Sequence, residues 1–247
     1  MKRFLFAGCF SLAYLYTISQ KTIDVDKENI RITGGFNDLN TVGGVPFANA
    51  KFARLVSGSP FFRDEMMKGI LISHDSTQYK NVIVRLNLLE SQVNYLDKRK
   101  EEMIVGTPLR EVILWDTVNN KQYQFVFFDH IKTTDKPEKD FYELLQKGKA
   151  ELFKQHKKIM KEDRPYNSAT YEQSIQTNIR YFVLWDGQWI KVGKVKDLVN
   201  VLSDKKAEVQ QFINGKGLSG GKQEDLETLI SYYNGLFDNN QFKKTFN

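Results

Sequence analysis

The sequence predicts an α+β protein that is mainly β: an antiparallel β-meander forms a sandwich or barrel-like core, and a small C-terminal unit of two to three helices follows it. Strand-like runs separated by turn residues follow one another roughly every 10 to 14 residues from Gly69 onward. After Val192 the apolar residues change from a period of two to a period of about 3.6. The 247 residues are 41% hydrophobic and 27% charged, a globular composition that excludes collagen-like, low-complexity and disordered chains.

The first nineteen residues have the layout of a signal peptide. Lys2 and Arg3 precede a mostly apolar run, Phe4 to Ile18, and Thr17 and Ser19 are the small residues that a signal peptidase reads. The alternative is a buried first helix of a cytosolic protein, but the position of the run, its two leading cations and its polar end favour the signal. We therefore predict a signal peptide over 1–19 and export to the periplasm or the extracellular space.

The single cysteine lies inside this segment, so the mature chain is expected to be disulfide-free. A lipid anchor is an alternative, but Phe6 replaces the Leu of a lipobox and the apolar run continues past Cys9. Cleavage also lowers the formal net charge from +6 to +4, because Lys2 and Arg3 are removed. No later run reaches the roughly 18 apolar residues of a spanning helix, so we expect no transmembrane segment in the mature chain.

The composition and the spacing of apolar residues divide the remaining chain into four segments. The stretch after the signal is punctuated by glycine and proline, and Ile30–Ile32 and Phe52–Val56 are its best strand candidates. We expect a loop-rich N-terminal segment with short strands over 20–68, an antiparallel β domain over 69–192, a helical unit over 193–235 and a polar tail over 236–247.

Six runs in the first part of the β domain combine strand-forming residues with flanking turn signals. They are Gly69–Ser73, Asn81–Leu86, Gln92–Asp97, Met103–Val105, Glu111–Asp116 and Gln122–Phe128. The last two contain stretches, Val112–Trp115 and Phe125–Phe128, that are apolar at successive positions. A sheet with one wet face would alternate there, so we expect these strands to be buried on both faces.

The segment 141–159 is compatible with a helix or with two strands. We favour two strands, Tyr142–Gln146 and Ala150–His156, because Lys147-Gly148-Lys149 suits a hairpin turn. Residues 161–177 are expected to form a polar loop.

A second hairpin is predicted together with its register. Asp186-Gly187 separates two β-rich runs, Tyr181–Trp185 and Gln188–Val192. Asp-Gly suits a type I′ turn, in which both central residues take positive φ. A two-residue turn at this place sets Leu184 opposite Trp189.

Three helices are expected after the sheet, each marked by apolar residues at helical spacing and by capping residues. They are Val195–Leu202, a second helix capped by Ser203 and stopped by Gly215 and Gly217, and Lys222–Asn234 followed by Gly235.

The C-terminal region carries a family resemblance. Its most distinctive pieces are Tyr181-Phe182, Asp186-Gly187, Lys191–Leu198, Asp204–Lys206 and Tyr232–Asn234, with weaker pieces upstream at Ser59–Phe62, Arg85–Asn87, Tyr95–Asp97 and Phe141–Glu143. These residues resemble the ending of many uncharacterised exported proteins of Bacteroidota, over more than half of the mature chain. The resemblance implies a Gram-negative envelope as the destination. It implies no activity, since none is assigned to the group.

No motif identifies a reaction, so the catalytic residues are unknown, and we predict no cofactor and no metal site. His74-Asp75-Ser76 holds the residue types of a catalytic triad, but their adjacency favours a polar turn between strands. Asp129-His130 has no second ligand at a metal-binding spacing. Asp24–Glu28 departs from a calcium loop at Asn29, and Gly215–Lys222 lacks the spacing of a phosphate loop.

Positive charge gathers between Lys147 and Arg164, a run that also contains Lys149, Lys154, Lys157, Lys158 and Lys161. Such a run can bind a polyanion or an anionic membrane surface, although a solvated face is the simpler interpretation. The tryptophans Trp115, Trp185 and Trp189 could stack on a sugar, but aromatic residues on strands more often belong to the core.

These observations favour an exported envelope protein that is a non-catalytic ligand- or protein-binding module. Its partner is expected to be an envelope protein or a small ligand, and we expect no binding of nucleic acid. The alternatives are a hydrolase whose active site the sequence does not reveal, and polyanion or membrane-surface binding through residues 147–164. A concave pocket with convergent polar groups would favour the enzyme. An exposed apolar patch would favour a protein partner.

Overall fold

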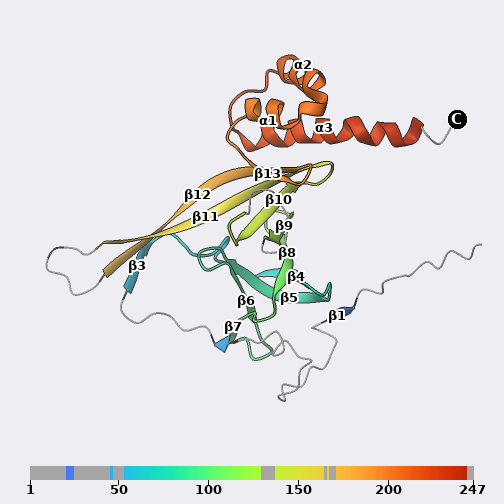
Figure 1. The fold of residues 1–247 in the computed structure, drawn as a ribbon. Coiled ribbons are helices and arrows are strands. Elements are labelled where there is room, and N and C mark those ends of the chain that lie inside the picture. Colours follow the sequence, from blue (N-terminus) through green and yellow to red (C-terminus); the bar gives the residue numbers. More distant parts are fainter. Residues whose placement is uncertain are drawn as a thin grey trace, which may run out of the picture.

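The computed structural model describes residues 21–24, 45–46, 53–128, 137–163, 166 and 171–243 of the chain, and Figure 1 shows how its elements are arranged. The predicted signal peptide, the strand candidate Ile30–Ile32 and the pair Asp129-His130 lie outside these residues. The fold is mainly β with three α-helices, which confirms the predicted class. All described strands belong to one sheet, and the helices lie together over one end of it.

The predicted meander forms the middle of the sheet. Its strands are β4 (Met67–Ser73), β5 (Gln78–Asn87), β6 (Gln92–Leu96), β7 (Glu102–Ile104), β8 (Leu109–Asp116) and β9 (Lys121–Phe127). They lie in the order β9-β8-β4-β5-β6-β7 with antiparallel pairing throughout, so β8 returns along the chain to pair with β4.

Two further hairpins continue the sheet beyond β9. Their strands are β10 (Phe141–Gln146), β11 (Ala150–Asp163), β12 (Tyr171–Trp185) and β13 (Gln188–Val192). Strands rather than a helix therefore occupy 141–159, as we favoured. In the second hairpin Leu184 pairs with Trp189, and Asp186 and Gly187 have φ of 48° and 71°, which confirms the predicted register and turn type.

The predicted polar loop over 161–177 is wrong. The pairing of β11 with β12 runs without a break from Ala150 opposite Trp185 to Asp163 opposite Glu172. Most of this segment is therefore strand, and both of its faces are largely exposed. Strands that are wet on both sides need no apolar alternation, so the sequence carries no period-two signal there.

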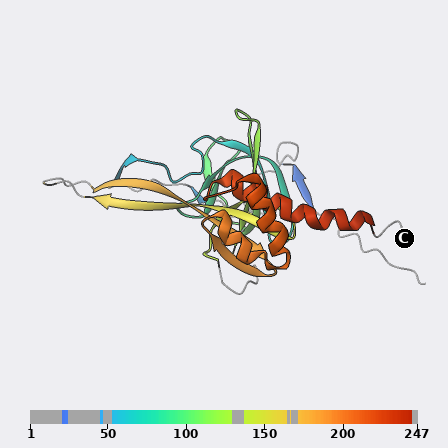
Figure 2. The same ribbon diagram turned by 90° about the horizontal axis from the view of Figure 1, so that it is seen from above.

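The outer part of this hairpin projects from the body of the molecule (Figure 1). A short strand, β3 (Ala53–Ser57), runs parallel to its end, with Ala53 opposite Tyr171. This strand coincides with the predicted Phe52–Val56. We call β3, residues 157–163 of β11, residues 171–179 of β12 and Tyr166 between them the arm. Seen from above in Figure 2, the arm and the C-terminal end of the last helix extend in opposite directions.

Two minor strands complete the sheet. β1 (Thr22–Asp24) runs parallel to β5, and β2 (Val45–Pro46) pairs with β7. The parallel pairs make the sheet mixed. Its end strands, β13 and β2, do not pair with each other, so the described strands form one open sheet and not two stacked sheets.

The sheet curls in two directions and thereby buries both of its faces. One face of β4–β10 encloses a meander core that includes Leu71, Val84, Tyr95, Val112 and Phe125. The opposite face of β9–β13 encloses an aromatic core of Phe128, Tyr142, Phe153 and Trp189, with Phe182 packed beside it. The rings of Trp189 in β13 and of Phe128, the residue that follows β9, are only 4.4 Å apart. In a flat sheet, four strand spacings of about 4.8 Å would separate β13 from β9.

The helices are α1 (Val195–Val201), a 3₁₀ turn η1 (Ser203–Lys205), α2 (Lys206–Lys216) and α3 (Gln223–Lys243). They cover the face of β11–β13 that the aromatic core leaves open and bury a third cluster, including Leu152, Val183, Leu198 and Leu229. This explains why successive residues of β11 and β12 are apolar. No helix among the described residues has the length and apolar character needed to cross a membrane.

Two predicted helix ends differ in the structure. Ser203 lies in the 3₁₀ turn, and Lys205 precedes α2 without a side-chain cap. Helix α3 does not stop at Gly235 but continues to Lys243, so the first part of the predicted polar tail is helical. Gly217 ends α2 in the left-handed conformation, as predicted.

Candidate functional site

The arm carries an unusual concentration of exposed apolar side chains. Among the residues that the structure describes, seven large apolar side chains are exposed, and all but Val118 lie on the arm: Leu55, Val56, Ile159, Met160, Tyr166 and Ile179. Met160 pairs with Ile175 and Gln173 pairs with Leu55, so alternation places Leu55, Met160 and Ile179 on one face. The arm therefore presents an apolar patch to solvent.

The arm also has an open backbone edge. From Tyr181 onward β12 pairs with β13, and up to Ser174 it pairs with β3. Between these partners, the edge of Gln176–Arg180 faces no other described strand. Unpaired strand edges are sites where another chain can add a strand.

Just after β3, a glycine lets the chain lie close against β12. Gly58 has φ of +79°, and a Cβ at this position would lie 2.0 Å from the backbone oxygen of Ile175. Only glycine allows this close approach of two backbones. Phe62, a few residues further on, packs edge-to-face on Phe125 and on His156 at ring distances of 4.9 and 5.2 Å, which fastens the same connection to the body.

The root of the arm is the place where β11 enters it, at His156 and Lys157. On one face, a polar network fixes this root. Lys157 Nζ lies 3.0 Å from a carboxylate oxygen of Glu138 and 3.5 Å from one of Asp140. The Asp140 side chain is almost fully buried and also accepts hydrogen bonds from Ser91 and Gln155. The hydrogen bond from Lys157 is the main cause that lowers the pKa of Glu138. These contacts hold the arm in a set direction.

On the other face of the root lies a buried pair. His156 Nε2 and a carboxylate oxygen of Glu143 are 2.6 Å apart, and both side chains are nearly inaccessible. Burial is the largest cause of the lowered pKa of His156, and the contact with Glu143 opposes it. Burial alone would raise the pKa of Glu143, but the hydrogen bond with His156 and the charge of Lys154 lower it on balance. A neutral His156 that donates to an ionised Glu143 fits both directions.

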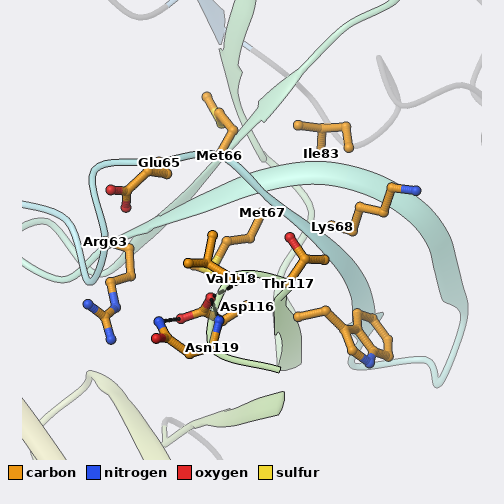
Figure 3. A pocket seen from close by; sticks show the side chains of 11 residues that line it. Arg63, Glu65, Met66, Met67, Lys68, Ile83, Asp116, Thr117, Val118 and Asn119 are labelled. Carbon is orange, nitrogen blue, oxygen red and sulfur yellow. Dashed lines mark hydrogen bonds between the residues drawn. The ribbon is translucent and has the colours of Figure 1, made fainter. Parts of the chain in front are cut away.

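A first cavity of about 280 Å³ lies between the segment before β4 and the β8–β9 turn (Figure 3). Two of its charged groups, Asp116 and Arg63, already have partners within the chain. The carboxylate of Asp116 accepts hydrogen bonds from the backbone of Val118 and from both the backbone and the side chain of Asn119. Arg63 donates to the hydroxyl of Tyr123 at 3.3 Å. Asp116 thus shapes the β8–β9 turn, and its carboxylate is already supplied with donors.

A second cavity, which we call the cleft, has a volume of about 370 Å³. It lies on the sheet face that carries the aromatic core, and its apolar floor includes Val126, Leu144 and Phe153. Its polar lining comes from two groups of strands. His74 follows β4, Arg110 and Glu111 belong to β8, and Gln124 belongs to β9. Lys147 and Glu151 come from the β10–β11 hairpin.

The two carboxylates of the cleft differ in their partners. Glu111 accepts hydrogen bonds from Arg110 Nε at 3.1 Å and from Gln124 Nε2 at 2.9 Å. The carboxylate of Glu151 has no hydrogen bond or ion pair with any part of the chain that the structure describes. Burial raises the pKa of Glu151; the charge of Lys147 opposes this rise and that of Glu111 adds to it.

The triad-like residues form a turn, as predicted. Asp75 accepts hydrogen bonds from Ser73 and from the backbone of Thr77, and not from His74. The hydrogen bond from Ser73 is the main cause that lowers the pKa of Asp75. Ser76 Oγ accepts from Arg110. Among the described residues no group of three or more His, Cys, Asp or Glu side chains could hold a metal ion.

The basic run is divided by the structure. Lys149 pairs with Asp204 on the helical unit, Lys154 donates to Gln223 of α3, and Lys157 pairs with Glu138. Strand alternation also directs Lys154 and Lys158 to one face and Lys157 and Lys161 to the other. Of the three tryptophans, Trp189 is buried in the aromatic core and Trp185 donates to Tyr233 of α3.

Sequence reasoning missed the arm and the cleft. The cleft combines residues from four strands, and no local spacing connects Glu111 with Glu151. The arm is polar in sequence, and its apolar residues become a patch only through the register of β3, β11 and β12.

No protein-family model, curated protein or solved structure matches this chain. Its function must therefore be inferred from the geometry of its own residues.

Proposed function

We propose that this chain is a non-catalytic binding module of the bacterial envelope that engages a protein partner through its arm. The observation that carries the proposal is the apolar patch of Leu55, Met160 and Ile179 on a projecting element. Exposed apolar patches are characteristic of protein interaction sites. Export is proposed with it, because a cleavable signal is the best interpretation of the first nineteen residues.

The way in which the arm is held supports this function. Lys157, Glu138 and Asp140 fix its root on one face, and Glu143 and His156 fix it on the other. A rigid arm loses little conformational entropy when a partner binds. The open edge at Gln176–Arg180 lies beside the patch, so a partner that adds an extended segment there would gain backbone hydrogen bonds and apolar contact together.

The alternatives have weaker support. The hydrolase has the cleft and its two carboxylates in its favour, but Glu111 is already engaged by Arg110 and Gln124. Binding of a polyanion or a membrane through residues 147–164 requires cations on a common face. Several of these lysines are paired, and they point to opposite sides of the hairpin.

Capture from envelope fractions of the source bacterium tests the proposal. The bait is the mature chain, compared with a triple variant that carries Leu55→Gln, Met160→Gln and Ile179→Thr. We expect one envelope protein to be captured and identified with the parent chain and lost with the triple variant. The matched control is Val118→Gln, which removes an exposed apolar side chain outside the arm and should leave capture unchanged.

Two outcomes would contradict the proposal. Equal capture by the triple variant would show that the arm is not the contact surface. A homodimer of the parent chain in light scattering, lost in the triple variant, would show that a second copy covers the patch and not a different protein. Melting curves of all variants show whether each is folded, and we expect changes in unfolding free energy within about 0.5 kcal/mol per surface substitution.

A further inference from the structure

The cleft has the size and lining of a small-molecule site. Its volume of about 370 Å³ falls within the range of roughly 300–1,000 Å³ that ligand pockets occupy. Such pockets combine an apolar surface with a few placed polar groups, and here the apolar Val126 and Leu144 line the cleft together with Glu111, Gln124 and Glu151.

The unpaired carboxylate indicates what a ligand must supply. Glu111 has its hydrogen-bond donors in Arg110 and Gln124, whereas Glu151 has none among the described residues although it is partly buried. A carboxylate that is withdrawn from water without donors is costly. A ligand with hydroxyl or amide hydrogens would provide the missing bonds.

The charges that line the cleft favour a ligand without net charge. The two cations of the lining, Arg110 and Lys147, equal in number its two carboxylates, Glu111 and Glu151. Electrostatics therefore select neither an anion nor a cation. A donor-rich molecule with one apolar face and no charge fits such a lining, and sugar rings have this character.

We propose that the cleft binds a neutral sugar, with Glu151 accepting hydrogen bonds from its hydroxyl groups and with Val126 and Leu144 in contact with the C–H face of the ring. This site is separate from the arm and does not rest on the proposed protein partner. The arm variants described above should bind the sugar as the parent chain does.

Saturation-transfer NMR on the mature chain tests the proposal with defined probes. These are glucose, galactose, mannose and N-acetylglucosamine as neutral sugars, and glucosamine as the cationic counterpart of the acetylated sugar. We expect at least one neutral sugar to bind and glucosamine to bind no more tightly than N-acetylglucosamine. Glu151→Ala should weaken the binding about tenfold or more, because hydrogen bonds to charged groups contribute about 1.5–3 kcal/mol.

The matched control is Glu90→Ala, which removes an exposed carboxylate in the β5–β6 turn, outside the cleft. It should leave sugar binding unchanged, and melting curves confirm that both variants are folded. The proposal is overturned if none of the neutral sugars binds or if Glu151→Ala binds as the parent chain does. It is also overturned if glucosamine binds more tightly than its acetylated form, because the cleft would then select a cation.

Discussion

The backbone conformation of the turn, and not contact with a neighbouring residue, favours glycine at position 187. It has φ of +71°, and a Cβ at this position would meet no atom within 4 Å. Gly187→Val should therefore lower the free energy of unfolding by about 1–3 kcal/mol through backbone strain alone. Gly215 in α2 is equally open but has no positive φ, so Gly215→Ala should stabilise the chain by about 0.4–1 kcal/mol. Urea denaturation measures both, and a loss of stability in both variants would contradict the strain argument.

Trp189 links four aromatic neighbours in the core of the curled sheet. It is 5% exposed, and its ring stacks on Phe182 at 5.0 Å and touches Phe128 at 4.4 Å. Trp189→Ala should cost about 3–5 kcal/mol, as expected for a buried aromatic side chain. Trp115→Ala, at the half-exposed wall of the first cavity, should cost less. If the melting midpoint of Trp189→Ala did not move, Trp189 would have to be an exposed ligand platform and not core.

The Glu143–His156 pair should make stability depend on pH. Both groups have lowered pKa values in the folded chain, so the unfolded chain takes up their protons at higher pH than the folded chain. Their contribution to stability is full above the ordinary His pKa of about 6.5 and is lost as the pH falls. Urea denaturation between pH 8 and about pH 5 should show this decline. His156→Gln should flatten it, and an unchanged slope would show that other groups cause it.

At the scale of the element, the root of the arm depends on Lys157. Lys157→Gln removes the cation beside buried Asp140 and should lower the free energy of unfolding by about 1–3 kcal/mol. Lys161→Gln, four residues further along the same face, should change it by less than about 0.5 kcal/mol. Hydrogen exchange should also become faster in 157–163 of the first variant. Equal effects of the two substitutions would mean that the network does not hold the arm.

Elements with strong local chemistry were predictable. The Asp186-Gly187 hairpin was predicted with its register, because a two-residue turn leaves only one pairing. The outer half of β12 was not predicted, because its exposed polar residues, such as Gln176 and Asn178, have the composition of a loop. Helix α3 was cut short at Gly235, since glycine often ends a helix, yet it can lie inside one at a cost of about 1 kcal/mol.

The candidate sites were less predictable than the fold, for a physical reason. A cleft depends on the order of strands in the sheet. Glu111 of β8 and Glu151 of β11 line the same cleft because the sheet order β11-β10-β9-β8 places their strands near each other. The curl of the sheet that brings Phe128 next to Trp189 is also not indicated by any short stretch of sequence. The runs that are apolar at successive positions indicated only that both faces of these strands are buried.

At the scale of the whole molecule, export predicts a defined mature end. N-terminal mass spectrometry of envelope material should find a chain that begins at Gln20 or within about two residues of it. An intact Met1 in that material would contradict the signal peptide. The same measurement on a Thr17→Arg variant should show the uncleaved precursor, because a large cation does not fit the position that the peptidase reads.

If the chain is exported as proposed, the parallel pairing of β3 with β12 affects the order in which its strands can pair. A chain that crosses the membrane from its N-terminus delivers β3 long before β12, whereas the hairpins β10–β11 and β12–β13 can close as soon as they emerge, because their contacts are local. Under the proposed export, β3 emerges early and must therefore wait for its partner, and its backbone edge stays unpaired until β12 arrives.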